Sequence, residues 1–458
     1  MSRVVFLLFC LTLAVLPAPL ASNRDWAWSP LAAVAGLLLI CAGLSIVLDA
    51  DLARRLRDNL GALAIPACLT AVAVAWALLQ ISGWTPESWK TPISAVSVLG
   101  SEAALHTVAF DREAVLTGIM RWLTNVAFFL LGMMLGNRVD DARRLLASIV
   151  VAATLYTLYA MVAQVANSQA AWTGLEVWVP TAREFTGTFV NRNNYATYAG
   201  IAAVAALCLA FRPRRSEADE TWRQRWHRRL AALSGARAFW LAAALILVVG
   251  VILSASKAGG ISLSLALVAM AFIYTRGNRR IAAVAATVMI VLLAVLVLPG
   301  ATGLVVRLLA LATFGDADRE IIYGMTLQAI ELRPWTGWGL NSFSGAAQMF
   351  QPVTLRPYYD KAHNTYLELA FDLGIPAAAC IVLAVALIVL RCLRGFYERR
   401  RDPELAGAGF LVGVLTGFHA FFDFSLQIPA MACTFFAILG ISWAQSWRGR
   451  RAADGEDA

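Results

Sequence analysis

Apolar runs of about 17–23 residues recur along the chain, and shorter polar segments separate most of them. A helix needs about 20 apolar residues to cross a hydrocarbon core of about 30 Å, so each run could span a membrane. The pattern therefore predicts an all-α polytopic membrane protein with about twelve transmembrane helices. The spans are expected near residues 4–20, 29–49, 60–82, 113–136, 145–166, 194–211, 238–255, 259–275, 280–298, 373–391, 406–423 and 427–446.

The first run allows one alternative. It follows Arg3 and ends in Ala18-Pro19-Leu20-Ala21, which is also compatible with a cleaved signal peptide. Cleavage would leave the sidedness of the other spans unchanged.

The longest non-spanning segment lies between the ninth and tenth spans, at about 299–372. Asp318 to Leu332 has the apolar spacing of a helix, and Pro334 with the glycines that follow predicts its end and a turn. A second helix is expected from Ala362. This segment is therefore predicted to be a large helical loop outside the bilayer.

Composition and charge agree with this class. The 458 residues are 60% hydrophobic and 15% charged, whereas soluble domains are about 45–50% apolar and about 25% charged. The net charge of +9 comes mainly from arginines in alternate loops, so it indicates membrane topology and not nucleic-acid binding. The positive-inside bias predicts cytoplasmic termini and an extracytoplasmic loop at 299–372.

Two sets of ionisable residues stand out from this background. His363 lies at the mouth of the tenth span, where a neutral imidazole could take a proton from a hydroxyl group. His419 and Asp423 lie one helical turn apart near the end of the eleventh span. An ionisable pair at this depth is either functional or a structural pair whose two members satisfy each other. For His363 the alternative is an ordinary interfacial histidine.

Three cations lie on the predicted extracytoplasmic face, where the charge bias makes them uncommon: Arg192, Lys257 and Arg319. A phosphate or diphosphate at headgroup level would explain them, and headgroup snorkelling is the alternative. Asp316-Ala317-Asp318 is weak evidence for a metal, and we predict neither a metal site nor a cofactor.

Four segments together resemble the O-antigen ligase/polymerase superfamily, over roughly residues 187–440. They are Gly187-Thr188-Phe189-Val190-Asn191-Arg192-Asn193-Asn194-Tyr195-Ala196; Arg319 followed by Pro334 and Gly337-Trp338-Gly339; His363-Asn364 followed by Gly374; and Phe421-Phe422-Asp423-Phe424 followed by Gln427-Ile428-Pro429.

The resemblance implies a membrane glycosyltransferase of the bacterial inner membrane. It would transfer a glycan from an undecaprenyl-diphosphate donor to an acceptor hydroxyl on the periplasmic face, with inversion and without a metal. The acceptor would be a glycolipid or a growing polysaccharide, and a protein acceptor also stays open. A transporter of a small anion or of a lipid-linked glycan is the alternative function.

The resemblance also implies residue roles within residues 187–446, after the N-terminal helices of residues 1–186 and before a cytoplasmic tail at 447–458. His363 and Arg319 would be catalytic, and His419 and Asp423 would support them. Lys257 stands where the family usually has arginine. The substrate-binding set would be Arg192, Lys257, Asn194, Asn364 and Tyr366, and the cations are expected to share one cavity with His363.

Overall fold

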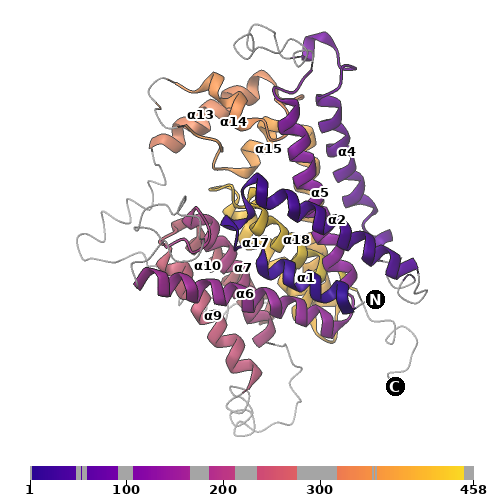
Figure 1. The fold of residues 1–458 in the computed structure, drawn as a ribbon, viewed down its shortest axis with the longest axis vertical. Coiled ribbons are helices and arrows are strands. Elements are labelled where there is room, and N and C mark those ends of the chain that lie inside the picture. The colour runs from indigo at the N-terminus through magenta and orange to yellow at the C-terminus, as the bar shows by residue number, and fades with distance from the viewer. Residues whose placement is uncertain are drawn as a thin grey trace.

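The computed structural model of the chain describes residues 3–47, 53, 59–90, 107–165, 185–211, 235–275, 317–352, 355 and 358–447. Every regular element within these ranges is a helix (Figure 1). The α-helices are α1 (Arg3–Val15), α2 (Asp25–Val47), α4 (Ala64–Gln80), α5 (Arg112–Leu135), α6 (Val139–Val165), α7 (Arg192–Ala210), α9 (Ala236–Leu253), α10 (Lys257–Tyr274), α13 (Ala317–Leu332), α14 (Phe343–Ala346), α15 (Thr365–Leu373), α16 (Ile375–Glu398), α17 (Pro403–His419) and α18 (Pro429–Ala444). Short 3-10 helices are η1 (Leu20–Ser22), η2 (Glu87–Trp89), η5 (Ala347–Phe350) and η6 (Ser425–Gln427).

Six of the described helices are long and apolar enough to cross a membrane: α2, α5, α6, α9, α10 and α16. The helices α1, α4 and α18 are also apolar but shorter. Every predicted span except 280–298, which lies outside the described residues, coincides with a helix. The all-helical, multi-pass class is confirmed for the described residues, and the number of twelve spans stays a prediction.

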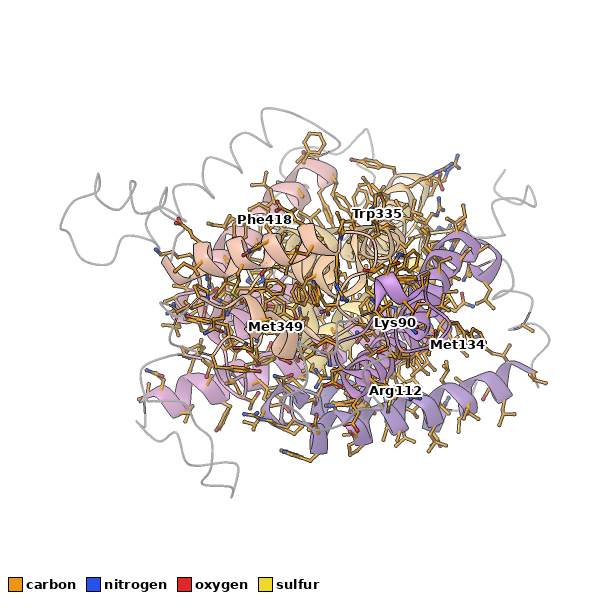
Figure 2. All side chains as sticks on the ribbon, turned by 90° about the horizontal axis from the view of Figure 1, so that it is seen from above. Lys90, Arg112, Met134, Trp335, Met349 and Phe418 are labelled. Atoms are coloured by element: carbon orange, nitrogen blue, oxygen red, sulfur yellow. The ribbon has the colours of Figure 1, made fainter. Side chains whose placement is uncertain are left out.

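The helix α18 forms the centre of the bundle, because all its residues from Pro429 to Ala444 are buried. Seen from above, its ribbon lies among the other helices (Figure 2). It packs backbone to backbone with α5 through two glycines. A Cβ on Gly440 would lie 1.9 Å from the Phe129 carbonyl oxygen, and one on Gly132 would lie 2.3 Å from that of Ala437. Small residues allow this close approach between apolar helices.

The helices α13, α14 and α15 form a layer at one end of the bundle, at the top of Figure 1. The predicted helix at 318–332 is confirmed as α13, and its buried side chains include Ile322 and Met325. Trp338 packs in the same core and donates its indole N–H to the Ala329 carbonyl at 3.0 Å. This layer therefore has an apolar core of its own.

Two glycines of the family motifs lock this layer to the start of α16. Gly337 and Gly374 both have positive φ, at 66° and 76°. A Cβ on Gly374 would lie 2.5 Å from the Trp335 carbonyl oxygen, and one on Gly337 would lie 2.4 Å from that of Asp372. Only glycine allows these two turns to meet backbone to backbone. The predicted turn after Pro334 and the break at Gly374 are thereby confirmed.

Candidate active site

His363 occupies a strained backbone position at the entrance to α15. Its φ is +51°, a left-handed conformation that costs a non-glycine residue about 1–3 kcal/mol. The flanking chain fixes this conformation: Ala362 donates its N–H to Glu368 Oε2 at 2.9 Å, and Asn364 caps α15. The Tyr323 hydroxyl donates to the His363 carbonyl at 3.1 Å. Three contacts therefore fix the backbone that carries this imidazole.

The imidazole of His363 faces the carboxylate of Asp423. Nδ1 and Oδ1 lie 3.5 Å apart, an ion-pair distance without the alignment of a full hydrogen bond. The Phe424 ring meets the imidazole edge-on at 4.9 Å, and the Phe424 N–H donates to Asp423 Oδ1 at 2.8 Å. Because the carboxylate approaches Nδ1, it favours the tautomer whose Nε2 carries the free lone pair.

The carboxyl group of Asp423 is fully buried in the turn after α17. Burial raises the pKa of this carboxyl, but the imidazoles of His363 and His419 and the Phe424 N–H outweigh burial and lower the pKa below its ordinary value. Asp423 is therefore a fixed negative charge beside His363.

The sequence predicted Asp423 as the partner of His419, one turn along a helix. The Asp423 N–H does donate to the His419 carbonyl at 3.1 Å, and the two side chains interact by charge, but the carboxylate lies at ion-pair distance from His363. Thr365 holds the turn: its N–H donates to Ala420 O at 2.8 Å and its hydroxyl donates to Asp423 O at 3.0 Å. The turn directs the carboxylate toward His363, which lies just before α15.

His419 instead faces Ser425, which sequence analysis did not single out. His419 Nδ1 and Ser425 Oγ lie 3.4 Å apart, and the same hydroxyl donates to Asn194 Oδ1 at 2.9 Å. Ser425 Oγ also lies 3.2 Å from Thr197 Oγ1. Ser425 thereby joins the start of α7 to the end of α17. Its place inside the Phe421–Pro429 motif was the signal that could have identified it.

The cations Arg192 and Lys257 begin α7 and α10, and both side chains are exposed. Ser256 caps α10 by accepting from the Gly259 N–H at 3.1 Å, and it donates to Asn193 Oδ1 at 2.7 Å. This bond places the two helix N-termini side by side. Helix N-termini carry partial positive charge and favour anions, so the charge of the two cations adds to that of the two termini.

Arg319 lies one turn before Tyr323 on α13, in the layer above the bundle. Burial raises the pKa of the Tyr323 hydroxyl, the positive charge of Arg319 lowers it, and the charge of Asp423 raises it. Both charges therefore act on one hydroxyl, which itself contacts the His363 backbone. The structure thus brings Arg319 to the surroundings of His363.

Besides Asn194, two more of the predicted substrate-binding residues already have structural partners. Asn364 Oδ1 accepts from the N–H groups of Tyr366 and Leu367, at 3.0 and 3.1 Å. The Tyr366 hydroxyl donates to the Gly417 carbonyl at 2.7 Å, and its ring packs on Phe421 at 4.5 Å. Their contact with substrate stays a prediction.

Residues 241–382 match the family model described as O-antigen ligase. The chain therefore carries an O-antigen ligase domain over these residues. A comparison with curated proteins found no match. The O-antigen ligase domain includes Lys257, Arg319 and His363, whereas Arg192 and Asp423 lie on either side of the matched range. The match confirms the predicted resemblance over residues 241–382. Together with the apolar helices, it supports a membrane protein of polysaccharide biosynthesis.

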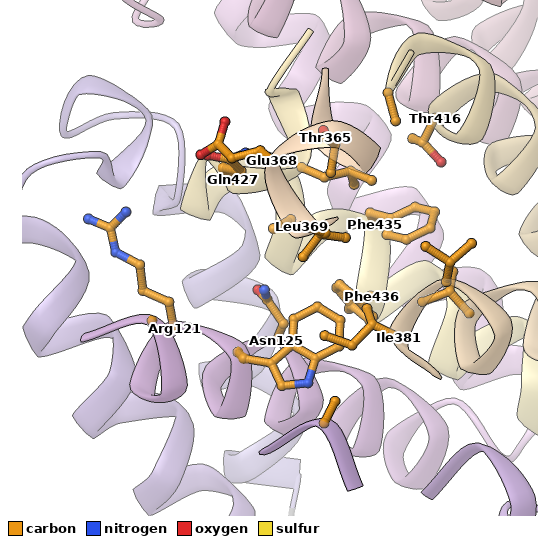
Figure 3. A pocket seen from close by; sticks show the side chains of 18 of the residues that line it. Arg121, Asn125, Thr365, Glu368, Leu369, Ile381, Thr416, Gln427, Phe435 and Phe436 are labelled. Carbon is orange, nitrogen blue, oxygen red and sulfur yellow. The ribbon is translucent and has the colours of Figure 1, made fainter. Parts of the chain in front are cut away.

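A cavity of about 380 Å³ borders the O-antigen ligase domain (Figure 3). Side chains of α2, α4, α5, α15, α16, α17 and α18 line it, including Thr365 and Tyr366 next to His363. His363 itself and the cations at positions 192, 257 and 319 are not in its lining. This cavity is therefore not the one that the sequence predicted these four residues to share.

Proposed function

We propose that the chain transfers a glycan from an undecaprenyl-diphosphate donor to an acceptor hydroxyl, on the periplasmic face of the inner membrane. The observation behind the proposal is the pairing of His363 with Asp423, in a turn that Ser425 bonds to the first turn of α7, which Ser256 joins to the start of α10. The O-antigen ligase domain at residues 241–382 supports the reaction class. In this orientation α13, α14 and α15 lie outside the bilayer.

His363 acts as the general base. Asp423 keeps the imidazole proton on Nδ1, so Nε2 takes the proton of the acceptor hydroxyl. The acceptor oxygen then bonds to the anomeric carbon of the donor, while the bond from that carbon to the diphosphate oxygen breaks on the opposite face. Undecaprenyl diphosphate leaves with the electron pair, and the product is inverted. Asp423 stabilises the imidazolium that forms.

Arg192, Lys257 and Arg319 bind the diphosphate and neutralise the charge that grows on it as it leaves. Fixed cations and helix N-termini aimed at developing charge lower the barrier without reorganising. These groups supply the stabilisation that a divalent ion gives to diphosphate leaving groups elsewhere. In the described ranges, no three His, Cys, Asp or Glu side chains group as metal ligands would. Metal independence is part of the proposal.

The test is transfer by purified protein from a defined undecaprenyl-diphosphate oligosaccharide to candidate acceptors, with the product identified by mass spectrometry. His363→Ala should lower the rate by about 10²–10⁴-fold, and Arg319→Ala by about 10²–10³-fold, because they lose the base and a charge-stabilising group. Arg112→Ala is the control for Arg319→Ala, since Arg112 is an exposed arginine at the first residue of α5.

Full transfer by both the His363 and the Arg319 variants would refute the assignment. Treatment with EDTA should leave the rate unchanged. Strong inhibition that one divalent ion reverses would contradict metal independence alone.

A further inference from the structure

Three asparagines lie next to Arg192 at the start of α7, one before it and two after it. Asn191 caps the helix by accepting the Asn193 N–H at 2.7 Å, which makes Arg192 the first residue of α7. Asn193 and Asn194 each use a side-chain oxygen to accept the hydroxyl of a serine from another segment. Two neighbouring residues therefore tie the start of α7 to two different parts of the chain.

Asn193 ties α7 to α10. Its Oδ1 accepts the Ser256 hydroxyl at 2.7 Å, and Ser256 Oγ in turn accepts the Gly259 N–H at 3.1 Å. The two helices also touch near their starts, because a Cβ on Gly259 would lie 2.6 Å from the Ala196 Cβ. Lys257 directly follows Ser256, so these contacts fix the backbone of Lys257 relative to α7.

The turn that presents Ser256 is strained. Ala255 has a φ of +53°, a left-handed conformation that is unfavourable for a residue other than glycine. The Ser254 hydroxyl accepts the Ser256 N–H at 3.2 Å and holds the turn. Strain of this kind persists only where the surrounding structure enforces it, and it is concentrated at functional sites. The position of Ser256 is therefore enforced by its surroundings.

Asn194 ties α7 to the turn after α17. Its side chain is buried, and its Oδ1 accepts the Ser425 hydroxyl at 2.9 Å. Ser425 lies two residues after Asp423, whose Oδ1 is 3.5 Å from His363 Nδ1. The Asn194 oxygen therefore supports the segment that carries the negative charge beside His363.

We propose that Asn193 and Asn194 are positioning residues with separate tasks, and that neither contacts substrate. The inference rests on the proposed function. Asn193 holds the cations of α7 and α10 together, so it governs how tightly the donor diphosphate binds. Asn194 holds Asp423 against His363, so it governs the rate of transfer. Both tasks belong to one helical turn because the donor and the base have to be placed relative to each other.

The first task can be tested without catalysis. The measurement is binding of undecaprenyl diphosphate to purified protein in nanodiscs, with undecaprenol as the probe that lacks the diphosphate. Asn193→Ala and Ser256→Ala should each raise the Kd for undecaprenyl diphosphate about tenfold and leave the binding of undecaprenol unchanged. Ser256→Thr keeps the hydroxyl and should bind as the wild type does. Ser264→Ala is the matched control, since the Ser264 hydroxyl donates to the Gly260 carbonyl inside α10.

A double-mutant cycle shows whether Asn193 acts through Ser256. If it does, the double variant should bind undecaprenyl diphosphate no more weakly than Ser256→Ala alone. Additive losses, about a hundredfold in total, would mean that Asn193 contacts the diphosphate itself and would overturn its role as a positioning residue. A wild-type protein that does not bind undecaprenyl diphosphate would overturn this role as well.

The second task is tested by the transfer assay. Asn194→Ala and Ser425→Ala should each lower kcat about tenfold and leave the donor KM unchanged, whereas Asn193→Ala should raise the donor KM and leave kcat unchanged. Ser425→Ala removes a single oxygen atom, so it decides the outcome if the Asn194 variant does not fold. The same change of kcat and donor KM in all three variants would overturn the separation of tasks.

The two assays separate this inference from the proposed function. Transfer by the wild type, with kcat and donor KM unchanged in every variant, would refute the positioning roles and leave the function intact. A wild-type protein that binds undecaprenyl diphosphate but transfers to no acceptor would refute the function together with the role of Asn194. The binding cycle would still decide the role of Asn193 in that case.

Discussion

Replacing Asp423 by asparagine isolates the charge beside His363. Asp423 Oδ1 both faces His363 Nδ1 at 3.5 Å and accepts the Phe424 N–H at 2.8 Å. An asparagine in the same rotamer can keep its oxygen in that place, so the turn keeps its backbone contact. The substitution then removes a negative charge and little else.

The magnitude follows from the distance. Two unit charges 3.5 Å apart interact by about 5 kcal/mol at an effective dielectric constant of about 20. This energy stabilises the imidazolium that forms during transfer, and each 1.36 kcal/mol is a factor of about ten in rate. The His363 side chain is 18% exposed, so water screens part of the interaction. We therefore expect kcat to fall by about 10³-fold, with the donor KM almost unchanged.

The assay is steady-state transfer by purified Asp423→Asn protein, with kcat and the donor KM measured separately from pH 6 to pH 9. The pKa of Asp423 is lowered, so the wild-type carboxyl stays ionised over this range. Asp140→Asn serves as the control, because Asp140 is an exposed carboxylate at the start of α6. Thermal melts establish that both variants fold.

A loss of less than about fivefold in a folded Asp423→Asn protein would refute the role of this charge. A rise in the donor KM with kcat unchanged would instead make Asp423 part of the donor site.

Three further predictions follow from other contacts. Gly374→Ala should lower the thermal melting temperature and the yield of active protein. The added Cβ would lie 2.5 Å from the Trp335 carbonyl oxygen, and φ at this position is 76°. Gly36→Ala is the control and should change neither quantity, because the space around Gly36 is open. Asp372→Asn removes a carboxyl group whose pKa is raised on folding. Because of this carboxyl, the wild-type protein should lose stability as the pH rises above about 3.9, the pKa of an aspartate in the unfolded chain. Thermal melts should show the variant level with wild type near pH 4 and increasingly more stable toward pH 9, and a constant difference would contradict this. Lys257→Gln should raise the donor KM about tenfold while Lys257→Arg keeps it low; unchanged donor KM in both would remove Lys257 from the diphosphate site.

Local patterns in the sequence predicted the helices well. The apolar runs coincide with helices because burial in a bilayer and helical hydrogen bonding both depend on residues close together in the chain. The turn at Gly337 and the break at Gly374 were also predictable, since glycine and proline limit the backbone directly. What no local pattern showed is that these two glycines contact one another.

The contacts that build the candidate site join distant parts of the chain. His363 meets Asp423, and Ser425 meets Asn194 across 231 residues, only after α7, α15 and α17 have packed. Helical periodicity brought His419 and Asp423 together, and the two do interact, but it could not show that His363 lies at ion-pair distance from the carboxylate. The turn held by Thr365 decides the pairing instead, and that turn is a tertiary contact.

A cryo-EM structure of the His363→Ala variant with an undecaprenyl-diphosphate oligosaccharide bound would test the central claim most directly. The account predicts diphosphate oxygens within about 3 Å of Arg192, Lys257 or Arg319, with the first sugar facing position 363. Diphosphate density beside Arg121 in the α5–α16 cavity, with the three cations empty, would contradict it.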